Sequence, residues 1–166
     1  GVNHYALDED YLESVAGPVR DALAELPGAT VIFSAHSLPV KQIVRTGDPY
    51  EGEIKACVAA LATKLGDLPG GTRLAYQSRV GPIRWLEPNL KEVLAECAGK
   101  DVIVVPISFV SEHIETLHEL DIEYREVAQH AGVRGYRRVP VPGVHPAFIR
   151  CLERHTLEAL KEDLPA

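Results

Sequence analysis

The 166-residue chain has no methionine, a single tryptophan and only three cysteines. Cys57, Cys97 and Cys151 lie far apart and form no Cys-x-x-Cys pair, which excludes a disulfide framework, a zinc ribbon and an iron–sulfur cluster built from this segment alone. Each cysteine falls within an apolar helical pattern. We therefore expect free, buried thiols in a reducing compartment.

Long hydrophobic runs are missing as well. The longest apolar run, VIVVPI at residues 102–107, is far too short to span a bilayer, and no signal peptide is recognisable. The net charge is -7 and the lysine and arginine residues are scattered, which excludes a nucleic-acid-binding surface. We expect a cytoplasmic protein with no transmembrane segment, compatible with peripheral membrane contact, whose partner is cationic, a small molecule or another protein.

Glycine-rich phosphate loops are the third absence. Neither GxGxxG nor GxxxxGK[ST] follows any apolar run, and GDLPGGT at residues 66–72 precedes a predicted strand instead of opening a helix. Nucleotide binding through either of these loops is therefore excluded.

Short, β-branched apolar runs alternate with helical patterns along the chain. Residues 29–35, 73–78 and 101–108 predict strands buried on both faces, and residues 133–140 predict a weaker fourth strand. The helical patterns cover residues 9–26, 51–65, 89–98, 112–131 and 146–162. This alternation predicts a single α/β domain over residues 1–166, a three-layer Rossmann-like fold whose parallel sheet of about four strands is flanked by helices.

Each clear strand runs into a polar segment: SAHSLP, QSRVGPIRWLEP and SFVSEHIE follow the first, second and third strands. Carboxyl ends of parallel strands meet at one edge of the sheet, so His36, Trp85 and Glu115 should converge there. Taken singly, His36 and Trp85 are more often structural residues. Together, an imidazole, a flat aromatic ring and carboxylates suit a large, flat ligand and a reaction that moves protons and a divalent metal ion.

An unusually acidic segment, VSEHIETLHELDIEY at residues 110–124, follows the third strand. A regular α-helix from Glu112 onward would place Glu115, Glu119 and Glu123 four residues apart on one face. Each like-charged pair at this spacing costs a helix about 0.2–0.5 kcal/mol. The acidic stripe is therefore either a solvated helix face or a site held together by a cation.

Four segments follow one another along the chain: SAHSLP, GDPY, YQSRVGPIRWLEP and PISFVSEHIETLHELDIEY. In this order they closely resemble the signature segments of ferrochelatases, which insert ferrous iron into a porphyrin to make haem. The resemblance is strongest from residue 31 to residue 145, and it implies a class II chelatase-like fold. Ferrochelatases usually contain two similar α/β domains that face each other across a cleft. This chain resembles the C-terminal half, and no segment resembles the N-terminal domain.

The resemblance also implies roles for individual side chains. His36 and Glu115 match the catalytic pair, and both, together with Glu119 and Glu123, match groups that bind or relay the metal. A distorted helical turn, common in the family at this point, would re-aim the carboxylates relative to a regular stripe. The substrate-binding positions match Ser78, Trp85, Phe109 and His113.

The implied reaction takes Fe(II) as a substrate and requires no further cofactor. Its partners would be a porphyrin and either the absent N-terminal domain or a second copy of the chain. Two alternatives stay open: a half-length chelatase that pairs with itself, and a porphyrin- or haem-binding module without turnover. The presence of both His36 and Glu115 argues against the binding module, which needs an aromatic wall more than two ionisable groups. No partner spacing compels a metal site at His118, His130, His145 or His155.

Overall fold

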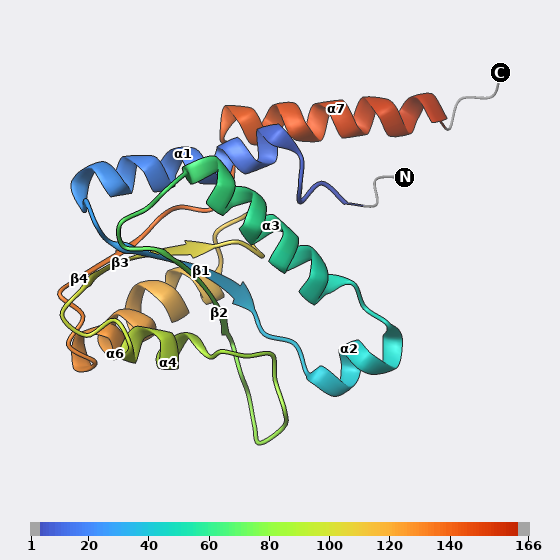
Figure 1. Ribbon diagram of the computed structural model, residues 1–166. Helices are drawn as coiled ribbons and strands as arrows, with labels where there is room; N and C mark the ends of the chain where they lie inside the picture. Colours follow the sequence, from blue (N-terminus) through green and yellow to red (C-terminus); the bar gives the residue numbers. More distant parts are fainter. Residues whose placement is uncertain (1–3, 163–166) are drawn as a thin grey trace.

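The computed structural model describes residues 4–162 as an α/β fold with one parallel sheet. Helices cover both faces of this sheet (Figure 1), so the predicted three-layer architecture is confirmed. The strands, in the spatial order β2-β1-β3-β4, are β1 (Thr30–His36), β2 (Thr72–Gln77), β3 (Asp101–Pro106) and β4 (Gly135–Arg138). One face carries α1 (Glu9–Glu25), α3 (Tyr50–Leu65) and α7 (Pro146–Glu162), and the other carries α4 (Leu90–Ala95) and α6 (Tyr124–His130).

The central strands are buried on both sides. Val31 and Phe33 of β1 pack among residues of α1, α3 and α7, whereas Ile32 packs among residues of α4 and α6, and all three side chains are fully buried. This alternation follows from the two-residue period of a strand. Since both faces are covered, the run is almost continuously apolar, and Ser34, which is buried within it, donates to Oε1 of Gln77.

The chain leaves β1 and β3 toward opposite faces of the sheet. After β1 it passes into α3, which packs with α1 and α7, and after β3 it passes into α6, which packs with α4. β1 and β3 are hydrogen-bonded neighbours. In open parallel sheets this divergence opens a crevice outside the carboxyl ends of the two strands. In this sheet that position lies between His36 and the segment that follows Pro106.

Two segments project beyond the carboxyl ends of the strands in Figure 1. One contains α2 (Val40–Thr46), a short helix that the sequence patterns did not predict and that buries none of its residues. The other is the segment of residues 78–88 between β2 and α4. The predicted helix at residues 89–98 is shorter than expected, with Asn89 capping it and Leu90–Ala95 forming it.

The acidic segment is not one regular helix, and the prediction of an α-helix from 112 to 131 is wrong. A single turn, α5 (Ile114–Leu117), leads into the π-helix η1 (Glu119–Glu123) and then into α6. The N–H of Glu123 donates to the carbonyl of His118, five residues back, over 3.1 Å. This wider turn changes the angular offset between successive side chains, as the family resemblance implied.

All three cysteines are free and buried, as predicted. Within residues 4–162, no helix combines the length and the apolar character that crossing a membrane would need.

Candidate functional site

His36 and Glu115 meet beyond the carboxyl ends of β1 and β3. His36 ends β1, Glu115 lies in the first turn of α5, and Nδ1 of His36 is 2.8 Å from Oε2 of Glu115. The two side chains are 33% and 35% exposed, so solvent and small ligands reach both. An imidazole hydrogen-bonded to a carboxylate can accept, hold and pass on a proton near neutral pH. We call the group built around this pair the strand-end site.

The main chain of His36 is fixed on both sides. Its N–H donates to Oγ of Ser108 over 2.7 Å, and the Tyr50 hydroxyl donates to its carbonyl oxygen over 2.8 Å. Burial raises the pKa of Tyr50, so this phenol remains a neutral donor. Neither partner was predicted from the sequence. Only the position of Ser108 at the end of a neighbouring strand could have indicated its contact with His36.

Phe109 and His113 support the pair. The Phe109 side chain is buried, and its ring meets the rings of His36 and His113 edge-on at centroid distances of 6.2 and 4.7 Å. Nδ1 of His113 accepts a hydrogen bond from the Glu115 N–H over 3.1 Å and thereby caps α5. These two residues therefore hold the catalytic candidates in place, and the Phe109 ring offers little open surface to a ligand.

Glu119 is held by three donors. The N–H and hydroxyl of Ser78 donate to its carboxylate over 2.7 and 2.5 Å, and Nε2 of Gln77 donates over 3.0 Å. Gln77 is fully buried, and its Nε2 also donates to the Glu115 carbonyl oxygen over 2.9 Å. Gln77 thus ties both glutamates to the end of β2. This role was not predicted from the sequence, although a polar residue at the end of an apolar run is a recognisable signal.

Ser78 adopts a backbone conformation that is rare for a residue with a side chain. Its φ of 62° lies in the left-handed region, and in residues 4–162 no other non-glycine residue has a positive φ. This conformation costs about 1–2 kcal/mol and persists because surrounding contacts fix it. Here it turns both the N–H and the hydroxyl of Ser78 toward Glu119.

Glu123 takes no part in the Glu115 and Glu119 contacts. Oε1 of Glu123 lies 3.2 Å from Nδ1 of His118, and more than half of each side chain is exposed. The expected stripe of three aligned carboxylates is therefore wrong, because the π-helix separates their directions and each has its own partner. Glu119 and Glu123 still border one cavity of about 260 Å³, whose lining includes the cations Arg79 and Lys91.

Arg138 anchors the acidic segment at two points. Its guanidinium donates to both Asp121 carboxylate oxygens over 2.7 and 2.8 Å and to Glu112 over 2.8 Å, and its side chain is only 10% exposed. Burial opposes the ionisation of Glu112, but hydrogen bonds from Thr116 and Arg138 hold its pKa below the ordinary value. Glu112 is therefore part of the scaffold that holds the acidic segment.

Trp85 lies beside a second cavity at the same edge of the sheet. It pairs with Pro39 in an antiparallel bridge, which joins the segments that follow β1 and β2. A cavity of about 530 Å³ adjoins this bridge, and three of its lining residues are cations: Lys41, Arg45 and Arg84. The structure brings Trp85 to the predicted edge, where its indole remains partly exposed.

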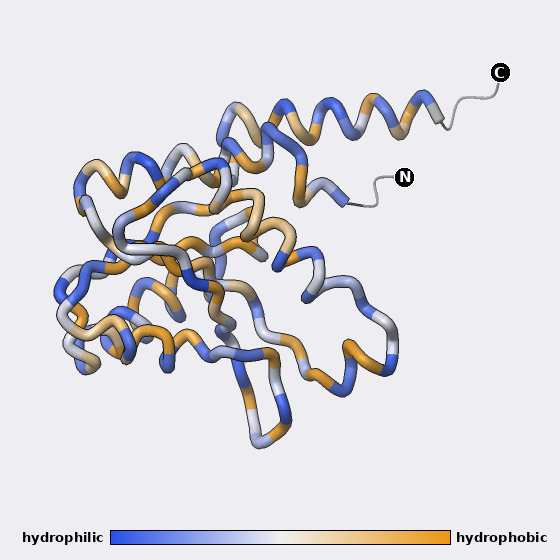
Figure 2. Tube along the Cα trace, viewed as in Figure 1, coloured by the Kyte–Doolittle hydropathy of each residue, from blue (hydrophilic) through white to orange (hydrophobic). Residues whose placement is uncertain are grey.

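Three apolar side chains on the segments that follow β1, β2 and β3 are largely exposed. Val44 of α2, Val80 of the segment after β2 and Ile114 of α5 are 77%, 77% and 74% exposed. Figure 2 shows hydrophobic positions along the two projecting segments. Exposed apolar surface gathered at one edge of a domain marks a ligand or partner surface. The strand-end site is thus an ionisable centre within an apolar border.

Comparison with known proteins places the chain beside one family. The family model described as Ferrochelatase matches residues 1–160. A curated ferrochelatase from Nostoc sp. is 47% identical over 158 residues, which is 92% of this chain and 40% of that protein, and one from Synechocystis sp. is 44% identical over 158 residues, 92% of this chain and 41% of that protein. The chain therefore spans about two fifths of the length of these relatives.

Among solved structures, SirB from Bacillus subtilis with Fe3+ is similar to this chain. The TM-score is 0.62, with 18% identity over 92% of this chain and 54% of that one. At this identity the likeness concerns the fold.

Proposed function

The chain belongs to the ferrochelatase family, and from this premise we propose that it forms one half of a site that inserts Fe(II) into a porphyrin in haem biosynthesis. The single observation that carries the proposal is the direct contact between His36 and Glu115, both about a third exposed, at the carboxyl edge of the sheet. As a lyase that forms nitrogen–metal bonds, such an enzyme must remove two pyrrole protons and deliver a metal ion. A proton acceptor beside a carboxylate suits both tasks.

The hydrogen bond between the two residues assigns roles to the imidazole nitrogens. Nδ1 of His36 faces the Glu115 carboxylate and donates to it, so Nε2 is the nitrogen with a free lone pair. We expect Nε2 to accept a pyrrole proton, after which the Glu115 carboxylate stabilises the imidazolium cation. Both residues also offer the nitrogen and oxygen donors that a divalent iron ion accepts.

Glu119 and Glu123 are the proposed route for protons or hydrated cations to and from the pair. Gln77 contacts Glu115 and Glu119, and the cavity of about 260 Å³ joins Glu119 to Glu123 at the surface. A carboxylate that keeps three donors, as Glu119 does, can exchange one of them for a cation without losing its position.

Trp85 and the apolar border are the proposed contact surface for the macrocycle, with Ser78, Phe109 and His113 positioning the ionisable groups. The exposed side chains of Val44, Val80 and Ile114 support a second wall that covers them. We propose that this wall is an N-terminal domain like that of the longer relatives. A second copy of the chain is the alternative, and size-exclusion chromatography of the isolated chain distinguishes the two. The free thiols support a cytoplasmic setting.

Porphyrin binding is tested with the tryptophan of the chain. Trp85 is the single tryptophan, so its fluorescence reports on this edge of the fold alone. Titration with a metal-free porphyrin should quench this emission to saturation, and Val80→Asp in the apolar border should weaken binding. An exposed-surface control, Glu126→Gln on α6, should leave the titration unchanged. Saturable quenching that Val80→Asp does not alter would contradict the proposed contact surface.

Turnover is tested in a chimera. This chain replaces the matching residues of the Nostoc sp. relative, which shares 47% identity over 158 residues, so the opposing domain is present. Fe(II) or Zn(II) insertion should occur and should be abolished by the double change His36→Ala and Glu115→Gln. Insertion by the chimera that survives this double change would refute the assignment, whatever the isolated chain does.

A further inference from the structure

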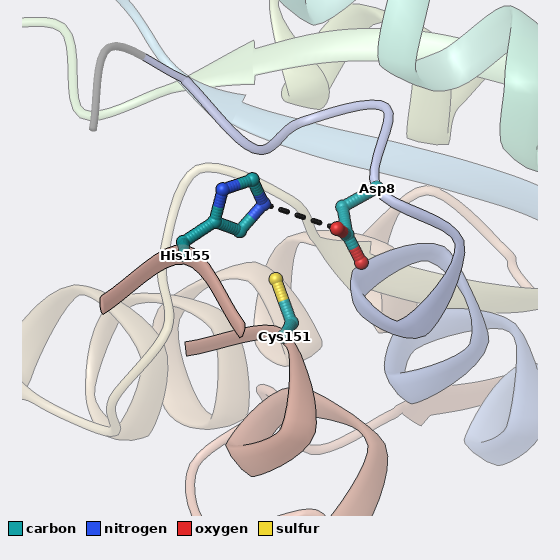
Figure 3. A group of neighbouring side chains, drawn as sticks. All are labelled: Asp8, Cys151 and His155. Atoms are coloured by element: carbon teal, nitrogen blue, oxygen red, sulfur yellow. Dashed lines mark hydrogen bonds and ion pairs between the residues drawn. The ribbon is translucent and has the colours of Figure 1, made fainter. Parts of the chain in front are cut away.

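A second group of ligating side chains lies away from the carboxyl ends of the strands, between the start of α1 and α7. Asp8, Cys151 and His155 each offer one ligand atom, and the three atoms lie within 4.8 Å of one another. In Figure 3 the two α7 side chains and the carboxylate of Asp8 point toward one another. We call these three residues the Asp8 cluster. Each belongs to a residue type that binds transition metals, and together they offer sulfur, nitrogen and oxygen donors.

We propose that Asp8, Cys151 and His155 bind a divalent transition metal ion in tetrahedral geometry, with Zn2+ as the occupant and the fourth position open toward an adjoining cavity. The inference is independent of porphyrin metallation, because it concerns different residues on a different layer of the fold. Only one cluster of three or more such ligands occurs within residues 4–162.

Regular secondary structure brings the three residues together. Cys151 and His155 lie four residues apart on α7 and therefore on one face of the helix. Asp8 is the N-cap of α1, so its carboxylate stands at the end of the helix that α7 packs along. The spacing Cys-x-x-x-His was visible in the sequence. Its third member, 143 residues before Cys151, was not.

The two carboxylate oxygens of Asp8 have different partners at the start of α1 and at the cluster. Oδ1 accepts from the N–H groups of Asp10 and Tyr11 and from Arg154. Oδ2 lies 3.0 Å from Nε2 of His155 and also accepts from Arg154 over 2.7 Å. The backbone bonds to Oδ1 orient the carboxylate so that Oδ2 faces the imidazole. Oδ2 is thus the ligand atom, and Arg154 is an outer partner that fixes the ligating carboxylate.

The distances are close to those of a tetrahedral zinc site. With metal–ligand bonds of about 2.0–2.3 Å, the ligand atoms lie about 3.3–3.6 Å apart. Oδ2 of Asp8 and Nε2 of His155 are already at 3.0 Å, and sulfur must move inward by about one ångström at most, because the whole group lies within 4.8 Å. Rotation of the Cys151 side chain supplies a movement of this size.

The outer partner of His155 fits as well. With Nε2 toward the metal, Nδ1 carries the proton, and Oε2 of Glu158 lies 3.8 Å from Nδ1. A carboxylate behind the second nitrogen is the usual orienting partner of a metal-bound histidine. One turn of α7 thus provides both the ligand and a carboxylate that a small side-chain rotation would bring to hydrogen-bond distance of Nδ1.

The thiol must lose a proton for the ion to bind. Burial and the neighbouring Asp8 carboxylate raise the pKa of Cys151 to about 11, so in the metal-free state the sulfur is protonated. Binding replaces the S–H bond by a sulfur–metal bond and releases the proton to solvent. A dication beside the carboxylate reverses the charge balance that disfavours the thiolate.

A cavity of about 370 Å³ adjoins the cluster. Its lining includes Asp8 and His155 together with His4 and Glu53, whose side chains are 3.3 Å apart. The fourth coordination position therefore has room for water and a path to solvent. Three protein ligands with one open position are the arrangement of exchangeable or catalytic zinc, whereas structural zinc is closed by four.

Cobalt(II) added to the purified full chain tests the site, because a cobalt–thiolate bond gives a near-ultraviolet charge-transfer absorption. The strand-end site contains no thiol and cannot produce this signal. We expect the absorption to saturate at one ion per chain, to be displaced by Zn2+ and to vanish in Cys151→Ser. The matched control Cys97→Ser, which changes another buried thiol, should retain it. If wild-type protein shows no saturable absorption, or if Cys151→Ser retains it, the proposal is overturned.

His155→Gln guards against a folding defect in Cys151→Ser. Its side chain is 23% exposed, so the change is compatible with the fold, and thermal unfolding checks this directly. Loss of a ligand should weaken cobalt affinity by more than about 100-fold, and loss of the outer partner in Glu158→Gln by about 10-fold. If His155→Gln folds and binds cobalt with unchanged affinity, Asp8 and His155 form an ion pair between α1 and α7 and the metal site is refuted.

Discussion

The strand-end site and the Asp8 cluster each bring a histidine and a carboxylate into contact, at 2.8 and 3.0 Å, but the chain builds them differently. The strand-end site stands on irregular backbone: a π-helix, a one-turn helix and a left-handed serine. The Asp8 cluster stands on a helix N-cap and one face of a regular helix.

The side chains of the strand-end site are also more exposed than those of the Asp8 cluster. His36 and Glu115 are each about a third exposed, whereas Cys151 is fully buried and the Asp8 side chain is 10% exposed. Irregular backbone can aim several side chains into an open crevice that a substrate must enter and leave. Regular backbone holds fewer groups and holds them in a more buried place, beside the cavity of about 370 Å³. The contrast suits a large ligand at the first site and a single small ion at the second.

The largest expected effect is on the rate of metal insertion, which should depend on the strand-end site and not on the Asp8 cluster. In the chimera, His36→Ala should lower metal insertion by about 10²–10⁴-fold, because a positioned general base contributes that much. Cys151→Ser in the same chimera should leave insertion unchanged. The measurement is the initial rate of Zn(II)-porphyrin formation, with His130→Ala on α6 as a surface control. Equal losses in the His36 and Cys151 variants would mean that the two regions act as one site.

Arg138 tests the anchoring of the acidic segment. Arg138→Met leaves Glu112 and Asp121 without their shared cation, and because both are about a third exposed we expect a loss of about 2 kcal/mol in the free energy of unfolding. Urea unfolding provides the measurement. Arg137→Met, which removes a surface pair with Glu25, should cost no more than about 0.5 kcal/mol. Similar costs for the two changes would show that Arg138 does not anchor the segment.

The ionisation of Asp8 makes the stability of the fold at the Asp8 cluster depend on pH. Burial would raise its pKa, but hydrogen bonds from Arg154, Tyr11 and Asp10 lower it from 3.8 to about 2. Its charge therefore stabilises the fold above about pH 4, and this stabilisation is lost as the pH falls toward 2. Asp8→Asn should cost about 1.5 kcal/mol at neutral pH, since Asn keeps the cap but loses the charged bonds to Arg154.

Thermal unfolding between pH 2 and pH 6 measures the difference. The gap between wild-type and Asp8→Asn proteins should close as the pH falls through this window. A gap that stays constant would show that the Asp8 charge contributes nothing. Glu158→Gln on α7 is the comparison variant, and its gap to wild type should be small throughout.

The smallest effect concerns the left-handed serine. Ser78→Ala removes one of three donors to Glu119 and keeps the strained φ, so we expect a loss of about 1 kcal/mol in unfolding free energy. Ser78→Gly removes the same hydroxyl but relieves the strain by about 1 kcal/mol, so it should be nearly neutral. Chemical denaturation of the two variants compares them. A glycine variant less stable than the alanine variant would contradict the assigned strain.

The sequence predicted the fold, and the meeting of His36 and Glu115 at one edge of the sheet, because both depend on local patterns. The apolar run of Val31, Ile32 and Phe33 indicates by itself a strand that is buried on both faces. Ligands bind at the carboxyl end of such a strand. His36 and Glu115 follow strands that neighbour each other in the sheet. Their proximity therefore followed from topology.

The side-chain partners needed three-dimensional structure. No pattern indicates that Glu119 turns toward Ser78 and Gln77 while Glu123 turns toward His118, because the π-helix depends on what the segment packs against. The Asp8 cluster joins residues about 145 positions apart, and only the packing of α7 along α1 brings them into contact.

The two hydrogen bonds on the main chain of His36 fix its backbone but do not involve its imidazole. Its N–H and carbonyl are bound to Ser108 and Tyr50, so the imidazole can turn about its two side-chain bonds while β1 stays in place. Exchanging Glu115 for another partner then requires rotation of the side chain but no movement of the sheet. A residue held in this way can change its side-chain partner repeatedly without disturbing the core beneath it.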